Sequence, residues 1–290
     1  MKDHAPSSEI ILNADGSIYH LGLRPEHLTD FIITVGDPER VAEVSKYFDS
    51  IDVMINKREF VSHIGRLGKK NIMVISSGMG TDNVEILLTE LDILANVNLS
   101  NLNPNAEHRT LTIIRVGTSG ALRKDVPLDS LLMSDYAFGL DTLMHFYGNK
   151  KNMLYSEHAR QLQQHMELSF EPYCERANET LKSLLTQELL TGNTLTCPGF
   201  YAPQGRRVKL PLQFENYHEK LKSFSFDGGK LTNFEMETAG YYALGKALGH
   251  KVLSTNAIVA NRETQKFSVH SSKTIDKLIR TVLSKISGLD

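Results

Sequence analysis

Residues 234–260 read FEMETAGYYALGKALGHKVLSTNAIVA, and the two patterns in this stretch decide the fold. After the first acids, the run of small, apolar and aromatic residues is typical of a buried helix. The segment HKVLSTNAIVA that follows is typical of a buried strand. A helix that leads directly into a buried strand is the repeating unit of an α/β sheet.

The same alternation extends along most of the chain. Strands are predicted at 31–35, 58–66, 71–76, 111–117, 131–138 and 192–197, with a hairpin around LGKK. Helices are predicted at 41–48, 81–97, 157–168, 175–190 and 271–286. Because no repeat, low-complexity tract or linker interrupts this pattern, we predict one α/β domain over residues 1–290, with 1–17 as a flexible N-terminal segment.

Composition narrows the class of protein. The 290 residues carry a net charge of −2 and are 41% hydrophobic, which favours a well-cored protein and gives no support for a nucleic-acid or membrane partner. The polar start MKDHAPSSEI lacks a secretory signal, and no run approaches the roughly 20 apolar residues of a membrane span. Cys174 and Cys197 are too few for a disulfide framework or a cysteine-built zinc site. We therefore expect a cytoplasmic protein.

The segment VGDPER follows a predicted strand and opens a predicted helix. Gly36 lets the backbone approach a ligand closely, and Pro38 suits a first helical turn. Exposed N–H groups there, with Arg40 one turn in, would hold an oxyanion. The alternative is a plain turn in which Arg40 is solvated or paired with Glu39 or Glu43.

The segment IIRVGTSGAL repeats this chemistry. Arg115 lies inside an apolar strand, where an unpaired charge is costly and needs a partner. Thr118 and Ser119 add hydroxyl groups, and the flanking glycines open the backbone. Together these groups suit a phosphate or carboxylate, although a buried salt bridge from Arg115 to an internal acid is the alternative.

Eight motifs, taken in order, resemble the nucleoside phosphorylases of the uridine phosphorylase type: HLGL, GDPER, KREF, GMG, RVGTSGAL, FYAPQGR, FEMET and NR. The resemblance extends from His20 to Arg262. It implies an α/β fold around a central mixed, partly barrel-like sheet flanked by helices. It also implies phosphorolysis of a nucleoside to a free base and ribose 1-phosphate, with inorganic phosphate as co-substrate and no cofactor.

The resemblance also implies how the site is divided. The residues that match phosphate ligands are Gly36, Arg40, Arg115 and Thr118, with Arg58 supplied by a neighbouring subunit. The residues that match ribose ligands are Glu235, Met236 and Glu237, with His20 from the neighbour reaching the 5′-hydroxyl. A dimer would then be the smallest working unit, and family members are commonly hexamers built from three dimers.

The two acids of FEMET have a second explanation. A carboxylate can accept hydrogen bonds from two vicinal ribose hydroxyls, a role that the resemblance gives to Glu237. Alternatively, Glu235 and Glu237 both complement the dipole of the helix that follows, at about 0.3–1 kcal/mol each. That explanation accounts for acids near a helix start but does not require both of them.

The resemblance implies a pyrimidine as the base. Gln204 and Arg206 match the pair that reads uracil and Phe200 matches the aromatic residue that stacks on it, although Arg207 is a second candidate for the inward arginine. Purine-specific relatives carry an aspartate after the late strand. Here the corresponding segment AIVANR (residues 257–262) contains no acid, and the next acid is Glu263. Arg262 instead resembles the pyrimidine-type ending, so uridine is favoured over inosine or adenosine.

The sequence departs from the family pattern in two places. Asp82 and Asn83 stand where better-known bacterial sequences carry small residues, which puts in doubt a monovalent-cation site near Glu59; the longer loop at 98–109 bears on assembly. Thr81 or Asp82 is the expected cap of the helix after GMG.

The alternatives to a uridine phosphorylase are a purine nucleoside phosphorylase, a hydrolytic nucleosidase and an inactive nucleoside-binding protein. A dinucleotide-binding reductase is disfavoured because VGDPER lacks the pattern GxGxxG.

Overall fold

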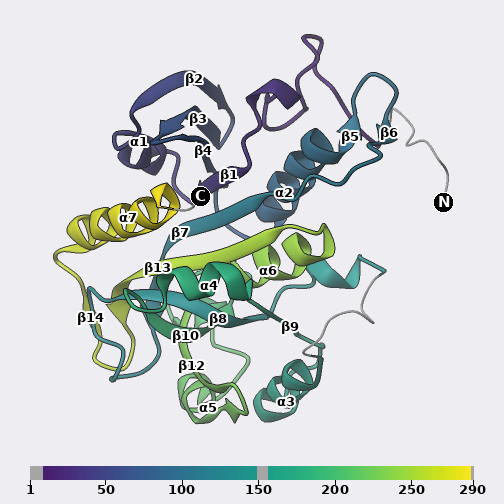
Figure 1. The fold of residues 1–290 in the computed structure, drawn as a ribbon. Helices are drawn as coiled ribbons and strands as arrows, with labels where there is room; N and C mark the ends of the chain where they lie inside the picture. The colour runs from purple at the N-terminus through teal and green to yellow at the C-terminus, as the bar shows by residue number, and fades with distance from the viewer. Residues whose placement is uncertain (1–8, 149–155, 289–290) are drawn as a thin grey trace.

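The computed structural model describes residues 9–148 and 156–288 (Figure 1). The strands of the main sheet are β1 (Phe31–Val35), β2 (Ser50–Lys57), β3 (Phe60–Leu67), β4 (Lys70–Ser76), β7 (Thr112–Ala121), β8 (Leu131–Gly139), β9 (Tyr173–Arg176), β10 (Leu190–Thr196), β11 (Ser225–Phe226), β12 (Gly229–Glu235), β13 (Lys251–Asn261) and β14 (Lys266–Phe267). The helices are α1 (Glu39–Ser45), α2 (Thr81–Asn96), α3 (Ser156–Met166), α4 (Glu179–Leu185), α5 (Tyr217–Ser223), α6 (Thr238–Ala247) and α7 (Ser271–Ser287).

The order of the strands places the ends of three parallel strands side by side. The sheet runs β11-β12-β10-β8-β13-β7-β1-β4-β3-β2. Strand β1 is parallel to both β4 and β7, and β7 is parallel to β13. Since carboxyl ends of parallel strands share one edge, the loops after β1 and β4 open beside the end of β7.

The sheet closes on itself at one end. Besides its central pairing with β1 and β13, β7 pairs with β12 through Asn233↔Ala121 and Phe234↔Gly120. This pairing completes a ring of β7, β13, β8, β10 and β12, while β1 to β4 extend from it as an open sheet. The prediction of an α/β fold with a mixed, partly barrel-like sheet is confirmed.

Helices cover the sheet according to their apolar faces. Helix α7 packs on β13 and buries Leu278, Val282 and Ile286 along one stripe. Helix α6 packs against α2 and the strands, and in Figure 1 these two helices lie side by side. Most of α6 is buried, as its apolar composition predicts.

The structure corrects three local predictions. The helix predicted at 175–190 is instead the end of β9, the short helix α4 and the start of β10; Asn178 ends the extended run because its side chain caps α4. Strand β7 continues through GTSGA rather than ending at Gly117. The cap of α2 is Gly80, not Thr81 or Asp82.

The described chain begins at Glu9, within the segment predicted to be flexible. Residues 1–8 of the predicted flexible segment lie outside the described residues. From Glu9 on, the chain forms a turn with a bridge between Leu12 and Ile18, and the Asn13 side chain bonds to Ser17 and to the Ile18 carbonyl. The loop 98–109 carries the short hairpin β5 (Val97–Asn98) and β6 (Asn103–Pro104).

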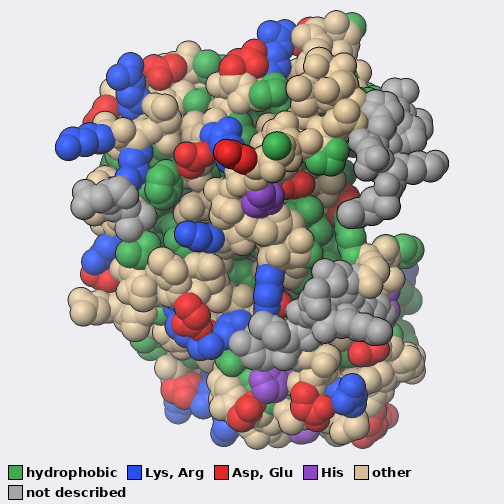
Figure 2. Space-filling view, turned by 45° about the vertical axis from the view of Figure 1, so that its right-hand side comes forward, with side chains coloured by type: hydrophobic (Ala, Val, Ile, Leu, Met, Phe, Trp, Pro, Cys, Tyr) green, Lys and Arg blue, Asp and Glu red, His purple; other side chains and the backbone are tan. Residues whose placement is uncertain are grey.

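The surface has no dominant sign of charge on the face drawn in Figure 2, where basic and acidic side chains are interspersed. Among the described residues, no helix is both long and apolar enough to cross a bilayer. Both cysteines are free and buried.

Candidate active site

One cavity of about 610 Å³ gathers most of the residues that the sequence singled out. Its lining includes Gly36, Arg40, Glu59, Arg115, Thr118, Phe200, Gln204, Arg206, Glu235, Met236 and Glu237. These residues come from segments up to 201 positions apart in the chain, from Gly36 to Glu237. Three predicted residues, His20, Arg58 and Arg262, are not in this lining.

Strand register brings the anion-binding candidates together. Gly36 directly follows β1, and Arg115 lies within β7 opposite Thr34 of β1. On its other side Arg115 is level with Ser254 of β13. Because β7 continues to Ala121, Thr118 faces the cavity from a strand rather than from a loop.

Arg115 is the buried cation at the centre of the cavity wall. Its Nη2 lies 2.5 Å from the Glu237 carboxylate and 3.2 Å from Glu235, and its Nη1 donates to Asn256 at 2.9 Å. Burial opposes its charge, but the two carboxylates outweigh burial and raise the pKa of Arg115. The salt bridge to an internal acid therefore exists, and it joins two residues of the same cavity.

The two acids of FEMET, Glu235 and Glu237, have different hydrogen-bond partners. Glu235 accepts hydrogen bonds from the backbone N–H groups of Glu237 and Thr238, at 2.9 Å for the closer contacts, and so satisfies the start of α6. Glu237 instead accepts from the N–H of Gly80 at 2.8 Å and from Arg115. Burial, followed by the nearby Glu235, raises the pKa of Glu237, while Arg115 lowers it. The helix-dipole explanation thus fits Glu235 alone.

Arg40 is a second cation of the cavity. Within the described part of the chain it forms no ion pair with Glu39 or Glu43, so the paired form of the plain-turn alternative is not present; Arg40 is half-buried and lines the cavity. Burial lowers the pKa of Arg40 most and Arg115 lowers it further, whereas Asp37 and Glu237 raise it. Arg115 is already paired with two carboxylates, whereas Arg40 has no ion pair among the described residues, so Arg40 is the cation with charge available to an anionic ligand.

The glycine turn after β4 also lines the cavity. Gly78 and Gly80 have φ of 74° and 94°, values that an L side chain rarely adopts. A Cβ on Gly78 would lie 2.5 Å from the Asn83 amide nitrogen. The turn therefore depends on glycine to hold its backbone against the cavity.

The far end of the cavity is aromatic and amide-lined. Arg206 lies over Phe200 at 3.6 Å from the ring centroid and is 5.8 Å from the centroid of Phe234. Its Nη1 donates to the buried Gln204 at 2.6 Å. Arg206 is thus the inward arginine, whereas Arg207 is not in the lining. A flat ring that stacks on Phe200 would take the position of this guanidinium, which must then move toward the ring edge.

Arg262 lies behind this aromatic end. Its Nη2 is 3.0 Å from Nε2 of His218 on α5, and its charge contributes, after burial, to lowering the pKa of Arg206. Glu263 turns away: it accepts from the N–H of Lys124 at 2.8 Å and lies 3.4 Å from Lys222. No acid therefore faces the aromatic end from the end of β13.

His20 and Arg58 lie near each other, outside the cavity of their own chain. The ring of Tyr19 is 4.7 Å from that of His20 and 5.6 Å from the Arg58 guanidinium. Sequence reasoning missed Glu90, a buried acid of α2 that binds the His20 ring at 2.6 Å. An acid on the apolar face of a predicted helix was the available signal. Sequence reasoning also missed Asn256, a buried side chain of β13 that accepts a hydrogen bond from Arg115.

Metal ligands are not clustered in the described chain, where no three His, Cys, Asp or Glu side chains form a group. Glu59 lines the cavity beside Asn83. The prediction of a monovalent-cation site near Glu59 stays a prediction.

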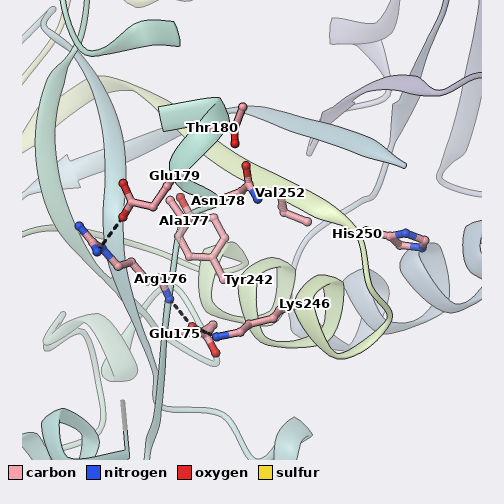
Figure 3. Close-up of a pocket in the computed structure, with 10 residues that line it drawn as sticks. All are labelled: Glu175, Arg176, Ala177, Asn178, Glu179, Thr180, Tyr242, Lys246, His250 and Val252. Atoms are coloured by element: carbon pink, nitrogen blue, oxygen red, sulfur yellow. Dashed lines mark hydrogen bonds and ion pairs between the residues drawn. The ribbon is translucent and has the colours of Figure 1, made fainter. Parts of the chain in front are cut away.

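A second hollow of about 320 Å³ lies between β9, α4 and α6 (Figure 3). Its charged groups are partnered within the hollow: Glu175 pairs with Lys246 at 2.9 Å and Arg176 with Glu179 at 2.7 Å. It lacks the convergent cations and the aromatic end of the first cavity.

Comparison with known proteins follows the same lines. The family model described as the phosphorylase superfamily matches residues 30–284. The chain belongs to the phosphorylase superfamily. Among phosphorylases of known sequence, it is 26% identical to uridine phosphorylase of Thermococcus kodakarensis, covering 92% of this chain and 86% of that one. It is 24% identical to uridine phosphorylase of Haemophilus influenzae, with 94% and 98% covered.

Solved phosphorylase structures share the fold. A Trypanosoma brucei nucleoside phosphorylase, described as showing uridine phosphorylase activity, aligns with a TM-score of 0.85 at 26% identity, over 95% of this chain and 99% of that one. A Toxoplasma gondii purine nucleoside phosphorylase aligns with a TM-score of 0.67 at 20% identity, over 96% and 97%. The resemblance that the motifs indicated is confirmed at the level of the family.

Proposed function

We propose that this phosphorylase is a uridine phosphorylase, a pentosyltransferase that converts uridine and phosphate reversibly to uracil and ribose 1-phosphate. The observation that carries the proposal is that one cavity holds the buried Arg115, the half-buried Arg40, two buried carboxylates and an aromatic end with an amide and a guanidinium. The uridine phosphorylases to which the chain is similar support the same reading.

The proposed chemistry uses each part of the cavity. Phosphate would bind between Arg40 and Arg115, with the Thr118 hydroxyl and the amides near Gly36 as further donors. Glu237 would accept hydrogen bonds from the 2′- and 3′-hydroxyls of ribose, with Met236 under the sugar and Glu235 holding the start of α6. As the glycosidic bond breaks, positive charge grows on the sugar above the phosphate. The phosphate oxygen then bonds to the anomeric carbon as the base leaves with the bonding electrons.

The base end favours a pyrimidine. Gln204 offers both a donor and an acceptor to the uracil edge, and Arg206 offers donors for the negative charge of the leaving base. A purine phosphorylase would protonate the ring with an acid, but Glu263 points away from this end. Water as the nucleophile would leave the paired cations without a role.

We propose that a second copy completes the site. His20 and Arg58 lie together around Tyr19 and outside their own cavity, so they could serve the cavity of a neighbour. Arg58 is exposed at the turn between β2 and β3, and Met54 on β2 is 62% exposed, which suits a contact surface. The dimer would be the working unit, and three such dimers would form a hexamer.

The proposed reaction is tested by release of base from uridine, thymidine, inosine and adenosine, with and without phosphate. The expected result is phosphate-dependent release of uracil. Faster cleavage of inosine would favour a purine phosphorylase, and full-rate release without phosphate would favour a nucleosidase. No turnover of any nucleoside, with retained binding, would point to an inactive binding protein.

Site sharing is tested by mixing two inactive variants. Arg58→Ala removes the residue given to the neighbour, and Glu237→Ala removes one that the chain keeps. If subunits exchange, a mixed dimer contains one site with both native residues, so activity returns on mixing. Activity that stays absent in mixtures shown by mass spectrometry to contain mixed dimers would contradict the shared site.

A further inference from the structure

We infer that His218 is a positioning residue of the base end: its unprotonated Nε2 holds the Arg262 guanidinium beside the loop that carries Gln204 and Arg206. The inference rests on the proposed phosphorolysis of uridine for the identity of the base. His218 stands in the first turn of α5, and Arg262 follows β13. Their contact therefore links a peripheral helix to the end of a central strand.

The proposed contact with Arg262 requires one form of the imidazole ring. Nε2 of His218 lies 3.0 Å from Nη2 of Arg262 and 3.2 Å from the carbonyl oxygen of Gly205. A guanidinium has donors only, so Nε2 accepts from Arg262 only if its lone pair is free, which puts the ring proton on Nδ1, a buried atom without a hydrogen-bond partner in the described structure. A proton on Nε2 would instead go to the Gly205 carbonyl and would oppose the N–H of Arg262.

The groups around the ring favour this neutral form. Burial lowers the pKa of His218 most, followed by Arg262 and Arg206, whereas Glu219 on the same helix and the Gly205 carbonyl raise it. Protonation would place a third positive charge beside two guanidiniums. It would also remove the acceptor that holds Arg262.

Gly205 connects the ring to the loop that reads the base. It has φ of 69°, and a Cβ there would lie 2.6 Å from Nε2 of His218, so the ring packs directly against the backbone between Gln204 and Arg206. Displacement of the ring would disturb that loop and Arg262 together. The cations of β7 and α1 lie on other elements, so phosphate binding should be spared.

The first test compares the KM for uridine with the KM for phosphate. His218→Gln keeps an acceptor but cannot titrate, whereas His218→Arg carries a permanent charge. In the wild type, the KM for uridine should rise as the pH falls below neutrality, and His218→Gln should lack this rise while keeping its KM near the wild-type value. His218→Arg should raise the KM for uridine about tenfold at every pH, the loss of about 1.4 kcal/mol of binding, with the KM for phosphate unchanged.

His165→Gln is the matched control. Its Nε2 lies 2.8 Å from the Lys220 carbonyl in the middle of α5 and 3.1 Å from the Ser223 hydroxyl at its end, so it tests packing of the helix without touching Arg262. It should leave both KM values and the pH profile unchanged. An equal rise of both KM values in His218→Arg, or an acid limb that persists in His218→Gln, would overturn the inference.

The second test needs no turnover and so separates this inference from the proposed function. Nitrogen NMR of the histidine rings at neutral pH should show His218 with a bare Nε2 and a protonated Nδ1. Arg262→Gln should raise the pKa of His218, because it removes a positive charge. A ring that carries its proton on Nε2, or a pKa unmoved by Arg262→Gln, would refute the positioning role even if uridine is the substrate. Failure of uridine turnover with this NMR result intact would refute only the reaction.

Discussion

Glu90 accepts hydrogen bonds from both the ring and the backbone of His20. The ring Nδ1 lies 2.6 Å from its carboxylate, the backbone N–H of His20 at 3.0 Å and that of Leu21 at 2.9 Å. A carboxylate partner at Nδ1 keeps a proton there and leaves Nε2 to face outward. The acid therefore sets the direction of the nitrogen that, in the proposed dimer, would meet the ribose 5′-hydroxyl.

Glu90→Gln should weaken recognition of that hydroxyl. Replacing the charged acceptor weakens a hydrogen bond that contributes about 1.5–3 kcal/mol, so we expect a rise of about tenfold in the KM for uridine. The KM for 5′-deoxyuridine, which lacks the hydroxyl, should hardly change. Steady-state kinetics with both substrates measures the difference. Glu85→Gln on the same helix is the control, since Glu85 bonds only to Tyr147 in the described contacts; equal losses on both substrates would contradict the role.

Arg115→Met should abolish turnover and destabilise the fold. The change leaves Glu235 and Glu237 buried without their cation, and breaking a buried pair costs about 3–5 kcal/mol. Thermal unfolding and phosphate titration measure the two effects. The double variant Arg115→Met, Glu237→Gln should regain part of the lost stability but no activity. A double variant less stable than Arg115→Met would argue against the charge explanation.

Glu237→Gln should act on the sugar. An amide offers a donor where the carboxylate offers an acceptor, so we expect kcat/KM for uridine to fall about a hundredfold, or about 2.7 kcal/mol. The loss for 2′,3′-dideoxyuridine should be much smaller, because that substrate has no vicinal hydroxyls to lose. Competition kinetics with the two nucleosides gives the ratio. Glu263→Gln, whose carboxylate points away from the cavity, should behave as the wild type.

Stability should decrease as the pH falls below about 6.5. Burial lowers the pKa of His63 in the folded protein below its ordinary value of 6.5, and the pKa of His218 is lowered too. As the pH drops, the unfolded chain binds these protons first, so the free energy of unfolding is full above 6.5 and declines below it. Unfolding midpoints across this range measure the slope. His63→Asn, beside Ser45, should flatten it, and an unchanged slope would rule out His63 as a cause.

Much of the fold followed from the sequence because its strands are buried on both faces. Runs such as FIITV are apolar except for the buried Thr34, and a covered sheet accommodates them. The prediction failed at 175–190, where β9 and α4 are short and the local pattern suits a helix. There the edge pairing of β9 with β8, a tertiary contact, decides the conformation.

Site residues could be predicted from the sequence where they lie on a buried strand or just after one. Gly36 and Arg115 were found because each lies on or just after a buried strand of one parallel group. Glu90 and His218 were missed because each acts through a partner distant in sequence, His20 and Arg262 respectively. Pairing of this kind depends on how helices dock on the sheet, which no local pattern reveals.

The ion pair between Arg115 and Glu237 also affects which anions can bind. A carboxylate already serves as the counterion of the guanidinium, so any incoming anion has to exchange with it. A single halide has one charge and no directional acceptors, and it gains little from that exchange. A tetrahedral dianion can engage Arg40 at the same time, and in the proposed reaction the carboxylate would then bind the sugar. The built-in counterion should therefore exclude chloride at cellular salt levels while admitting multivalent oxyanions.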